Sequence, residues 1–151
     1  MKDTSIRELF HQPPTETLTD ISVSGWVRTV RDSKAFGFIE LNDGTYFKNL
    51  QIVLEDGKTA DFANALKVTL GSAIRAKGDL VPTPGMKQPF EIKADELSVE
   101  GTCPADYPLQ KKRHTVEYLR TQAHLRPRTN LFSAVFRIRS LAAQAIHAFF
   151  A

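Results

Sequence analysis

The feature that most limits the fold of this chain of 151 residues is a set of five short segments with alternating apolar and polar residues. One helical segment lies between the third and the fourth of them. Such alternation puts the apolar side chains on one face of a β-strand. We expect a helix at 5–11, strands at 21–30, 36–41, 46–54, 73–81 and 90–99, and the interrupting helix at 59–68. Three strands, a helix and two strands suit a mostly β fold, a five-stranded Greek-key barrel of the oligonucleotide/oligosaccharide-binding (OB) type. The alternative is an unspecified α+β sandwich with the same elements.

The sequence changes character after Gly101. Residues 1–101 contain 12 Lys and Arg against 15 Asp and Glu, and the rest of the chain contains 8 against 2, so the net charge of +3 originates in the last third. Residues 102–110 contain prolines and no periodicity, which indicates a linker. A basic, helix-compatible region and a last helix follow in residues 111–151. We therefore expect an OB-fold barrel, a linker and a helical extension.

The composition excludes several classes of function. No run approaches the ~18 apolar residues of a membrane span, and the first residues carry Asp3 and Glu8 instead of the apolar run of a secretory signal. The single cysteine, Cys103, excludes an internal disulfide, and the four scattered histidines lack metal-ligand spacing. The chain has no glycine-rich phosphate loop and no catalytic triad. We expect a cytoplasmic protein with no metal site, catalytic residues or membrane contact of its own.

The same alternation predicts a nucleic-acid-binding face, because strands two and three of an OB barrel bind single-stranded nucleic acid. The polar and aromatic positions between core-facing residues are Phe36, Phe38, Gln51 and Glu91, and the first strand and its turn bring Arg28, Arg31 and Lys34 nearby. An outward aromatic ring stacks on a base, a glutamine amide reads a base edge and arginines hold phosphates. Arg31 shares parity with core-facing Val27, so it reaches this face only through a bulge or at a strand end. In the alternative, Phe36 and Phe38 pack under the N-terminal segment and Gln51 is a solvated strand residue.

Two blocks of sequence resemble a known family. Residues 24–34 read Ser-Gly-Trp-Val-Arg-Thr-Val-Arg-Asp-Ser-Lys, and with Phe38-Ile39 and Leu50-Gln-Ile-Val53 they resemble the anticodon-binding domain of class IIb aminoacyl-tRNA synthetases. Residues 112–120, Lys-Arg-His-Thr-Val-Glu-Tyr-Leu-Arg, and 124–130, His-Leu-Arg-Pro-Arg-Thr-Asn, resemble the passage from hinge to catalytic domain in the asparaginyl members. The resemblance extends from about Ser22 to Phe150.

By matching position, the resemblance implies roles for four of the candidate residues. It implies that Phe38 stacks on the middle anticodon base, a uridine in this subgroup, and that Gln51 reads the edge of that base. Arg31 and Glu91 match positions that contact the anticodon loop of the tRNA. The other candidate residues of this face, Arg28, Lys34 and Phe36, are not assigned a role in this way.

The resemblance also implies a parent asparagine–tRNA ligase that uses ATP and Mg²⁺ and forms a homodimer through the helix at 131–151. The second and third signature motifs of the catalytic domain are absent from the sequence, so we expect the chain alone to be catalytically inactive and to be an N-terminal piece of the enzyme. One alternative is a free-standing tRNA- or single-strand-binding module or truncated paralogue without ligase function. Another is a purely structural or dimerisation fragment.

Overall fold

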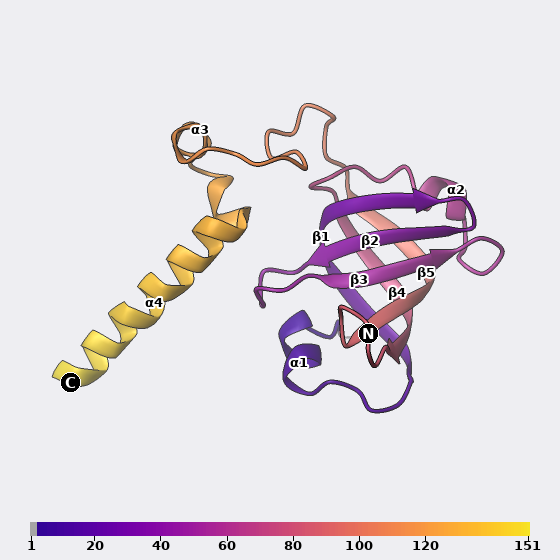
Figure 1. The fold of residues 1–151 in the computed structure, drawn as a ribbon, viewed down its shortest axis with the longest axis horizontal. Coiled ribbons are helices and arrows are strands. Elements are labelled where there is room, and N and C mark those ends of the chain that lie inside the picture. The colour runs from indigo at the N-terminus through magenta and orange to yellow at the C-terminus, as the bar shows by residue number, and fades with distance from the viewer. Residues whose placement is uncertain (1–2) are drawn as a thin grey trace. The chain divides into compact units, whose positions relative to one another are not determined.

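The computed structural model describes residues 3–151, and the chain divides into two compact units between Tyr107 and Pro108. The first unit is a closed five-stranded barrel with two short helices, and the second is helical (Figure 1). This confirms the predicted mostly β OB-fold barrel followed by a helical extension. Of the predicted linker, residues 102–107 belong to the barrel unit and residues 108–110 to the second.

The barrel is closed in the spatial order β1-β2-β3-β5-β4. Its elements in chain order are α1 (Ile6–His11), β1 (Leu18–Ser33), β2 (Phe36–Asn42), β3 (Leu50–Glu55), α2 (Phe62–Ala65), β4 (Ala73–Pro82) and β5 (Phe90–Gly101). The long β1 pairs with β4 through its first half and with β2 through its second half. The paired strands are antiparallel except for β3 and β5, which run parallel where Ile52 meets Ile92 and Val53 meets Lys93.

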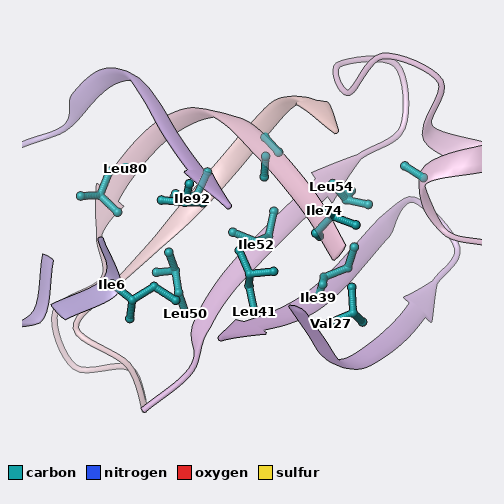
Figure 2. Packing of buried hydrophobic residues seen from close by; sticks show 14 of the residues in the cluster. Ile6, Val27, Ile39, Leu41, Leu50, Ile52, Leu54, Ile74, Leu80 and Ile92 are labelled. Carbon is teal, nitrogen blue, oxygen red and sulfur yellow. The ribbon is translucent and has the colours of Figure 1, made fainter. Parts of the chain in front are cut away.

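One apolar cluster fills the barrel and follows from the alternation of the strands (Figure 2). Ile39, Ile52 and Ile92, from three neighbouring strands, are completely buried. Helix α1 adds the buried Ile6 to this cluster, and its Phe10 ring stacks on Tyr46 at a centroid distance of 4.8 Å. The alternating apolar positions therefore form the core that the sequence predicts.

The predicted start of the third strand at Tyr46 is wrong, because β3 begins at Leu50. Asn42 Nδ2 donates a hydrogen bond to the Tyr46 carbonyl oxygen at 3.3 Å. The Asp43 carboxylate accepts one from the backbone N–H of Ile6 at 2.8 Å. Such bonds from Asn and Asp side chains compete with strand pairing, so the residues after β2 form a loop tied to α1 instead of a tight hairpin.

The helix predicted at 59–68 is also wrong in length, because α2 comprises only Phe62–Ala65. The buried Thr59 hydroxyl donates to the carbonyl oxygen of Ala94 at 2.7 Å, which fixes this residue to β5. Asp61 has a φ of 50°, in the left-handed region, so the helix begins only after it. The other strands match their predicted ranges to within three residues at each end.

The second unit contains α3 (Val116–Thr121), a 3-10 turn at Arg126–Arg128 and α4 (Asn130–Phe150). The hydroxyls of Thr115 and Thr129 accept the capping hydrogen bonds at the starts of α3 and α4, which explains why the helix expected in the basic region begins only after Thr115. Within residues 3–151, no helix combines the length and apolar character required to cross a bilayer.

Gly78 marks an irregularity in the pairing of β4 with β5, where the register shifts between Lys77 and Gly78. A Cβ atom at this position would lie 2.0 Å from the carbonyl oxygen of Lys93 and 2.8 Å from the Cα of Ala94. Real Cβ atoms do not approach backbone atoms so closely. The close approach of the two strands therefore requires glycine.

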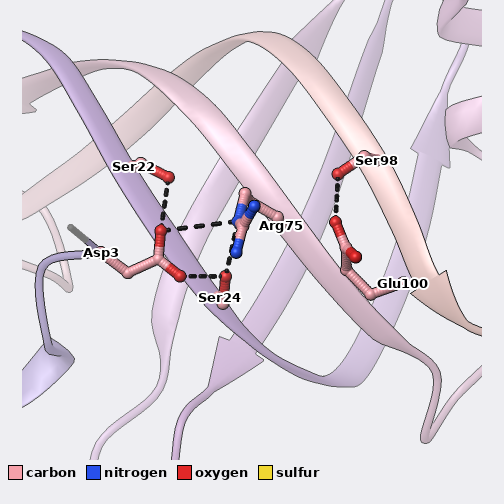
Figure 3. Close-up of polar contacts among 6 residues, drawn as sticks. All are labelled: Asp3, Ser22, Ser24, Arg75, Ser98 and Glu100. Carbon is pink, nitrogen blue, oxygen red and sulfur yellow. Dashed lines mark hydrogen bonds and ion pairs between the residues drawn. The ribbon is translucent and has the colours of Figure 1, made fainter. Parts of the chain in front are cut away.

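The segment before α1 is fastened to the outside of the barrel at Asp3 (Figure 3). The Ser24 hydroxyl donates to one carboxylate oxygen of Asp3 and the Ser22 hydroxyl to the other, at 2.7 Å for Ser22. Arg75 Nε lies 3.5 Å from the Asp3 carboxylate. The hydrogen bonds from Ser24 and Ser22, together with the charge of Arg75, lower the pKa of Asp3 below its usual value of 3.8.

Asp3→Asn is expected to destabilise the barrel by about 1 kcal/mol near pH 6, because a partly exposed, charge-assisted network is lost. A lowered pKa gives a contribution that is complete above pH 3.8 and disappears as the pH falls through the folded-state value. The difference in melting temperature between the parent chain and Asp3→Asn should therefore shrink below pH 3.8. Glu16→Gln, at an exposed carboxylate, is the control, and a difference that stays constant down to pH 2 would contradict the assignment.

Candidate nucleic-acid interface

The outward side chains of β1, β2, β3 and β5 form one surface, which we call the sheet face. It is defined by Arg31, Phe36, Phe38, Glu40, Gln51, Glu91 and Lys93. In β2 the buried Ile39 and Leu41 alternate with these residues, and in β3 the buried Leu50 and Ile52 flank Gln51. The strands therefore place this set outward by the same pairing that builds the core.

A β-bulge at Arg28 brings Arg31 onto the sheet face. Val27 pairs with Leu41, and Thr29 pairs with the adjacent Glu40, so Arg28 has no counterpart on β2. The extra residue reverses the parity of the following positions. This is the bulge that the sequence requires if Arg31 is to point away from the core.

After the bulge, Arg31 lies directly opposite Phe38. The Arg31 guanidinium carbon is 4.7 Å from the centre of the Phe38 ring, which is a cation–π contact. Arg31 is exposed and Phe38 is half-buried. The aromatic ring on this surface is therefore covered by an exposed arginine side chain, and it is not part of the buried core cluster.

Gln51 and Glu91 form the second contact of the sheet face. Gln51 Nε2 donates a hydrogen bond to Glu91 Oε2 at 3.0 Å, which links β3 to β5. Glu40 lies opposite Gln51 on β2, and its carboxylate accepts a hydrogen bond from Asn49 Nδ2 at 2.9 Å. Gln51 is half-buried, so part of the residue is accessible while the bond to Glu91 holds its amide.

The structure thus groups Arg31 with Phe38 and Gln51 with Glu91, on adjacent rows of the sheet face. Phe36 and Lys34 lie farther along, at the turn between β1 and β2. Phe36 is 41% exposed and pairs with Ser33, and Lys34 has a φ of 55° in the turn itself.

The N-terminal helix does not cover the predicted aromatic residues at the start of β2. Its Phe10 ring contacts Tyr46 and Phe90, beyond the opposite end of β2. Phe38 instead carries the guanidinium of Arg31. These contacts argue against the alternative in which the aromatic pair packs under the N-terminal segment.

Lys93 of the sheet face and Asn49, which bonds to Glu40, were missed by reasoning from the sequence. Lys93 is exposed and lies in the same cross-strand row as Phe38, because both residues pair with Val53. Its position between the buried Ile92 and Ala94 gives the same alternation signal that identified Glu91. Asn49 gave no such signal, because it lies in the loop that was read as strand.

Comparison with known proteins identifies relatives of this barrel. A family described as an OB-fold nucleic acid binding domain, of the tRNA anticodon class, matches residues 21–100. The asparagine–tRNA ligase of Acetivibrio thermocellus is 62% identical over 150 residues, which are 99% of this chain and 32% of the relative. The ligase of Clostridium kluyveri is 55% identical over the same span. The chain therefore spans about a third of the length of the curated relatives that it matches.

A solved structure shares the fold. The crystal structure of asparaginyl-tRNA synthetase from Pyrococcus horikoshii superposes with a TM-score of 0.83 at 19% sequence identity. The match covers 98% of this chain and 35% of that one. At this identity the likeness establishes the arrangement of the elements.

Proposed function

Because the chain belongs to the family of OB-fold nucleic acid binding domains of the tRNA anticodon class, we propose that it is the anticodon-recognising part of an asparagine–tRNA ligase. The observation that carries the proposal is the sheet face itself. An aromatic ring and a fixed glutamine amide lie on adjacent rows of it, at Phe38 and Gln51. Stacking on a ring and hydrogen bonding to a base edge are how proteins read unpaired bases.

The proposed roles follow from the chemistry of each side chain. Phe38 stacks on the middle anticodon base, which is a uridine because the middle base of asparagine codons is adenine. Gln51 accepts from and donates to the Watson–Crick edge of that base. Arg31, Arg28 and Lys34 provide the positive charges for the phosphates of the loop.

Arg31 has a further part in this proposal, because its guanidinium already lies over the ring of Phe38. A base that approaches the ring either displaces the guanidinium or stacks on its planar face. Both leave the guanidinium beside the bound nucleotide, where it reaches a phosphate. The proposal therefore places the cation and the stacked base at one position of the sheet face.

The test is the preference of the chain for one base at one position. We expect the protein to bind an RNA hairpin with the asparagine anticodon more tightly than hairpins in which the middle uridine is replaced. Gln51→Ala should reduce that preference by about 1–3 kcal/mol, because the hydrogen bonds to the base edge are lost. Fluorescence titration at a fixed salt concentration measures both quantities.

Asn49→Ala is the control for this variant, because it removes an amide that bonds to Glu40 and not to Gln51. Equal affinity of the parent chain for all the hairpins would overturn the proposed function. A preference that survives in Gln51→Ala would show that another residue reads the base.

We propose further that the binding of ATP and Mg²⁺ belongs to the whole enzyme and not to this chain alone. In this proposal ATP and Mg²⁺ are bound by the parts of the ligase that this chain does not match. Among residues 3–151, no three His, Cys, Asp or Glu side chains come together as metal ligands. Cytoplasm is the proposed location, where a ligase of translation meets its tRNA.

The proposed domain organisation is a barrel in 1–101, a linker in 102–110 and the start of the catalytic domain in 111–151. We propose α4 as the contact of a homodimer, and the supporting observation is its exposed apolar surface. That surface includes Leu131, Ile138, Leu141 and Phe149, all more than half exposed. A second subunit would bury side chains of this kind.

A further inference from the structure

The hydrogen bond between Gln51 and Glu91 has a consequence for specificity that rests on the proposed function. We propose that Glu91 is a positioning residue that makes the sheet face select uracil over cytosine, by holding the Gln51 amide in one orientation. Glu91 then acts on the base through Gln51. This differs from a direct contact between Glu91 and the RNA.

The orientation follows from what a carboxylate can do. An ionised carboxylate only accepts hydrogen bonds, whereas an amide has a donor end and an acceptor end. Gln51 Nε2 lies 3.0 Å from Glu91 Oε2, so the donor end of the amide faces Glu91. Turning the amide over would bring its oxygen against the carboxylate oxygen, and two acceptors at hydrogen-bond distance repel each other.

A fixed amide offers its donor and acceptor in one fixed order. One Nε2–H is used by Glu91, and the second Nε2–H and Oε1 remain for a ligand. Along its Watson–Crick edge, uracil presents the O4 acceptor and then the N3–H donor. Cytosine presents the N4–H donor and then the N3 acceptor, which is the reverse order. An amide free to turn over would match either pyrimidine, and an amide that cannot turn over matches one.

Of the two carboxylates beside Gln51, only Glu91 bonds to its amide and can set this orientation. On the β2 side, Gln51 faces Glu40, whose carboxylate is engaged by Asn49 Nδ2 at 2.9 Å. On the β5 side, it meets Glu91 directly. Both carboxylates lie on the sheet face, so they form a matched pair in which one contacts the amide and the other bonds elsewhere.

Glu91→Gln is the variant that tests the inference. A glutamine at this position can accept from Nε2 or donate to Oε1 of Gln51, so both orientations of the Gln51 amide become accessible. The probes are two RNA hairpins that are identical except for U or C at the middle anticodon position. We expect the parent chain to prefer U by about tenfold or more and Glu91→Gln to reduce this ratio to about threefold or less.

Glu40→Gln is the matched control, because it removes the same charge from the same face without touching the Gln51 amide. It should leave the ratio of the two affinities unchanged. A loss of U/C discrimination in Glu40→Gln equal to that in Glu91→Gln would show that surface charge sets the ratio, and would overturn the inference.

A double-mutant cycle separates positioning from direct contact. If Glu91 acts through Gln51, Glu91→Gln should have no further effect on the U/C ratio when Gln51 is already alanine. A persistent effect in that background would mean that Glu91 touches the base itself, and would contradict the inference. If the parent chain has no U/C preference, the proposed function fails. If the parent has the preference and Glu91→Gln retains it, only the role of Glu91 fails.

Discussion

Phe38→Ala is expected to weaken binding of a hairpin with the asparagine anticodon by about 1–3 kcal/mol, which is the cost of losing one base–aromatic stack. The ring is half-buried under the guanidinium of Arg31, so its removal leaves the apolar cluster of the barrel intact. The dependence of affinity on salt concentration should change little, since no phosphate contact is lost. Titrations at three salt concentrations measure both quantities.

Phe47→Ala is the control for Phe38→Ala, because Phe47 is 48% exposed and lies in the loop between β2 and β3, outside the sheet face. It should bind the hairpin like the parent chain. The melting temperature of each variant is measured as well, to separate a loss of stability from a loss of binding. A Phe38→Ala protein that melts lower but binds normally would mean that the ring serves the fold and that RNA binds elsewhere.

Gly78→Ala is expected to destabilise the barrel by about 3 kcal/mol, at the upper end of the usual cost of inserting a methyl group into a packed site. The new methyl group would fall 2.0 Å from the carbonyl oxygen of Lys93. Because this neighbour is backbone, β4 and β5 must move apart to relieve the overlap. Urea unfolding followed by circular dichroism gives the free energy of unfolding.

Gly101→Ala is the matched control in β5. A Cβ there meets only the Cβ of Ala73, at 3.7 Å, which is an ordinary contact. Its effect should stay within about 0.5 kcal/mol. If Gly78→Ala were as stable as Gly101→Ala, β4 and β5 would not approach as closely as the structure has them.

The barrel could be predicted from the sequence because its signal is the alternation of apolar residues. In β2 and β4 the buried positions, such as Ile39 and Leu80, follow that alternation throughout. The errors arose where side-chain hydrogen bonds decide the backbone. Asp43 holds the loop after β2 through its bond to Ile6, a residue 37 positions away. No pattern within a short window reports such a contact.

In the candidate site, too, the features that depend on local alternation could be predicted, and those that depend on long-range contacts could not. Parity alone placed Phe38, Gln51 and Glu91 on one face, since each lies beside a buried residue of its strand. Parity failed for Arg31, and only the register of β1 against β2 locates the bulge at Arg28 that corrects it. The contact of Arg31 with Phe38 and the bond of Gln51 to Glu91 depend on pairing between strands. A single strand does not contain that information.

The parallel pairing of β3 with β5 also affects how the barrel closes. It joins Ile52 to Ile92 and Val53 to Lys93, whereas its neighbours are longer antiparallel ladders. It is the shortest ladder of the closed barrel, and we call it the seam. The hydrogen bond between Gln51 and Glu91, which are 40 positions apart, joins β3 to β5 across this seam on the sheet face. On the proposed function, RNA that binds the closed barrel more tightly than the open one stabilises the closed form, so RNA affinity and barrel closure are thermodynamically linked.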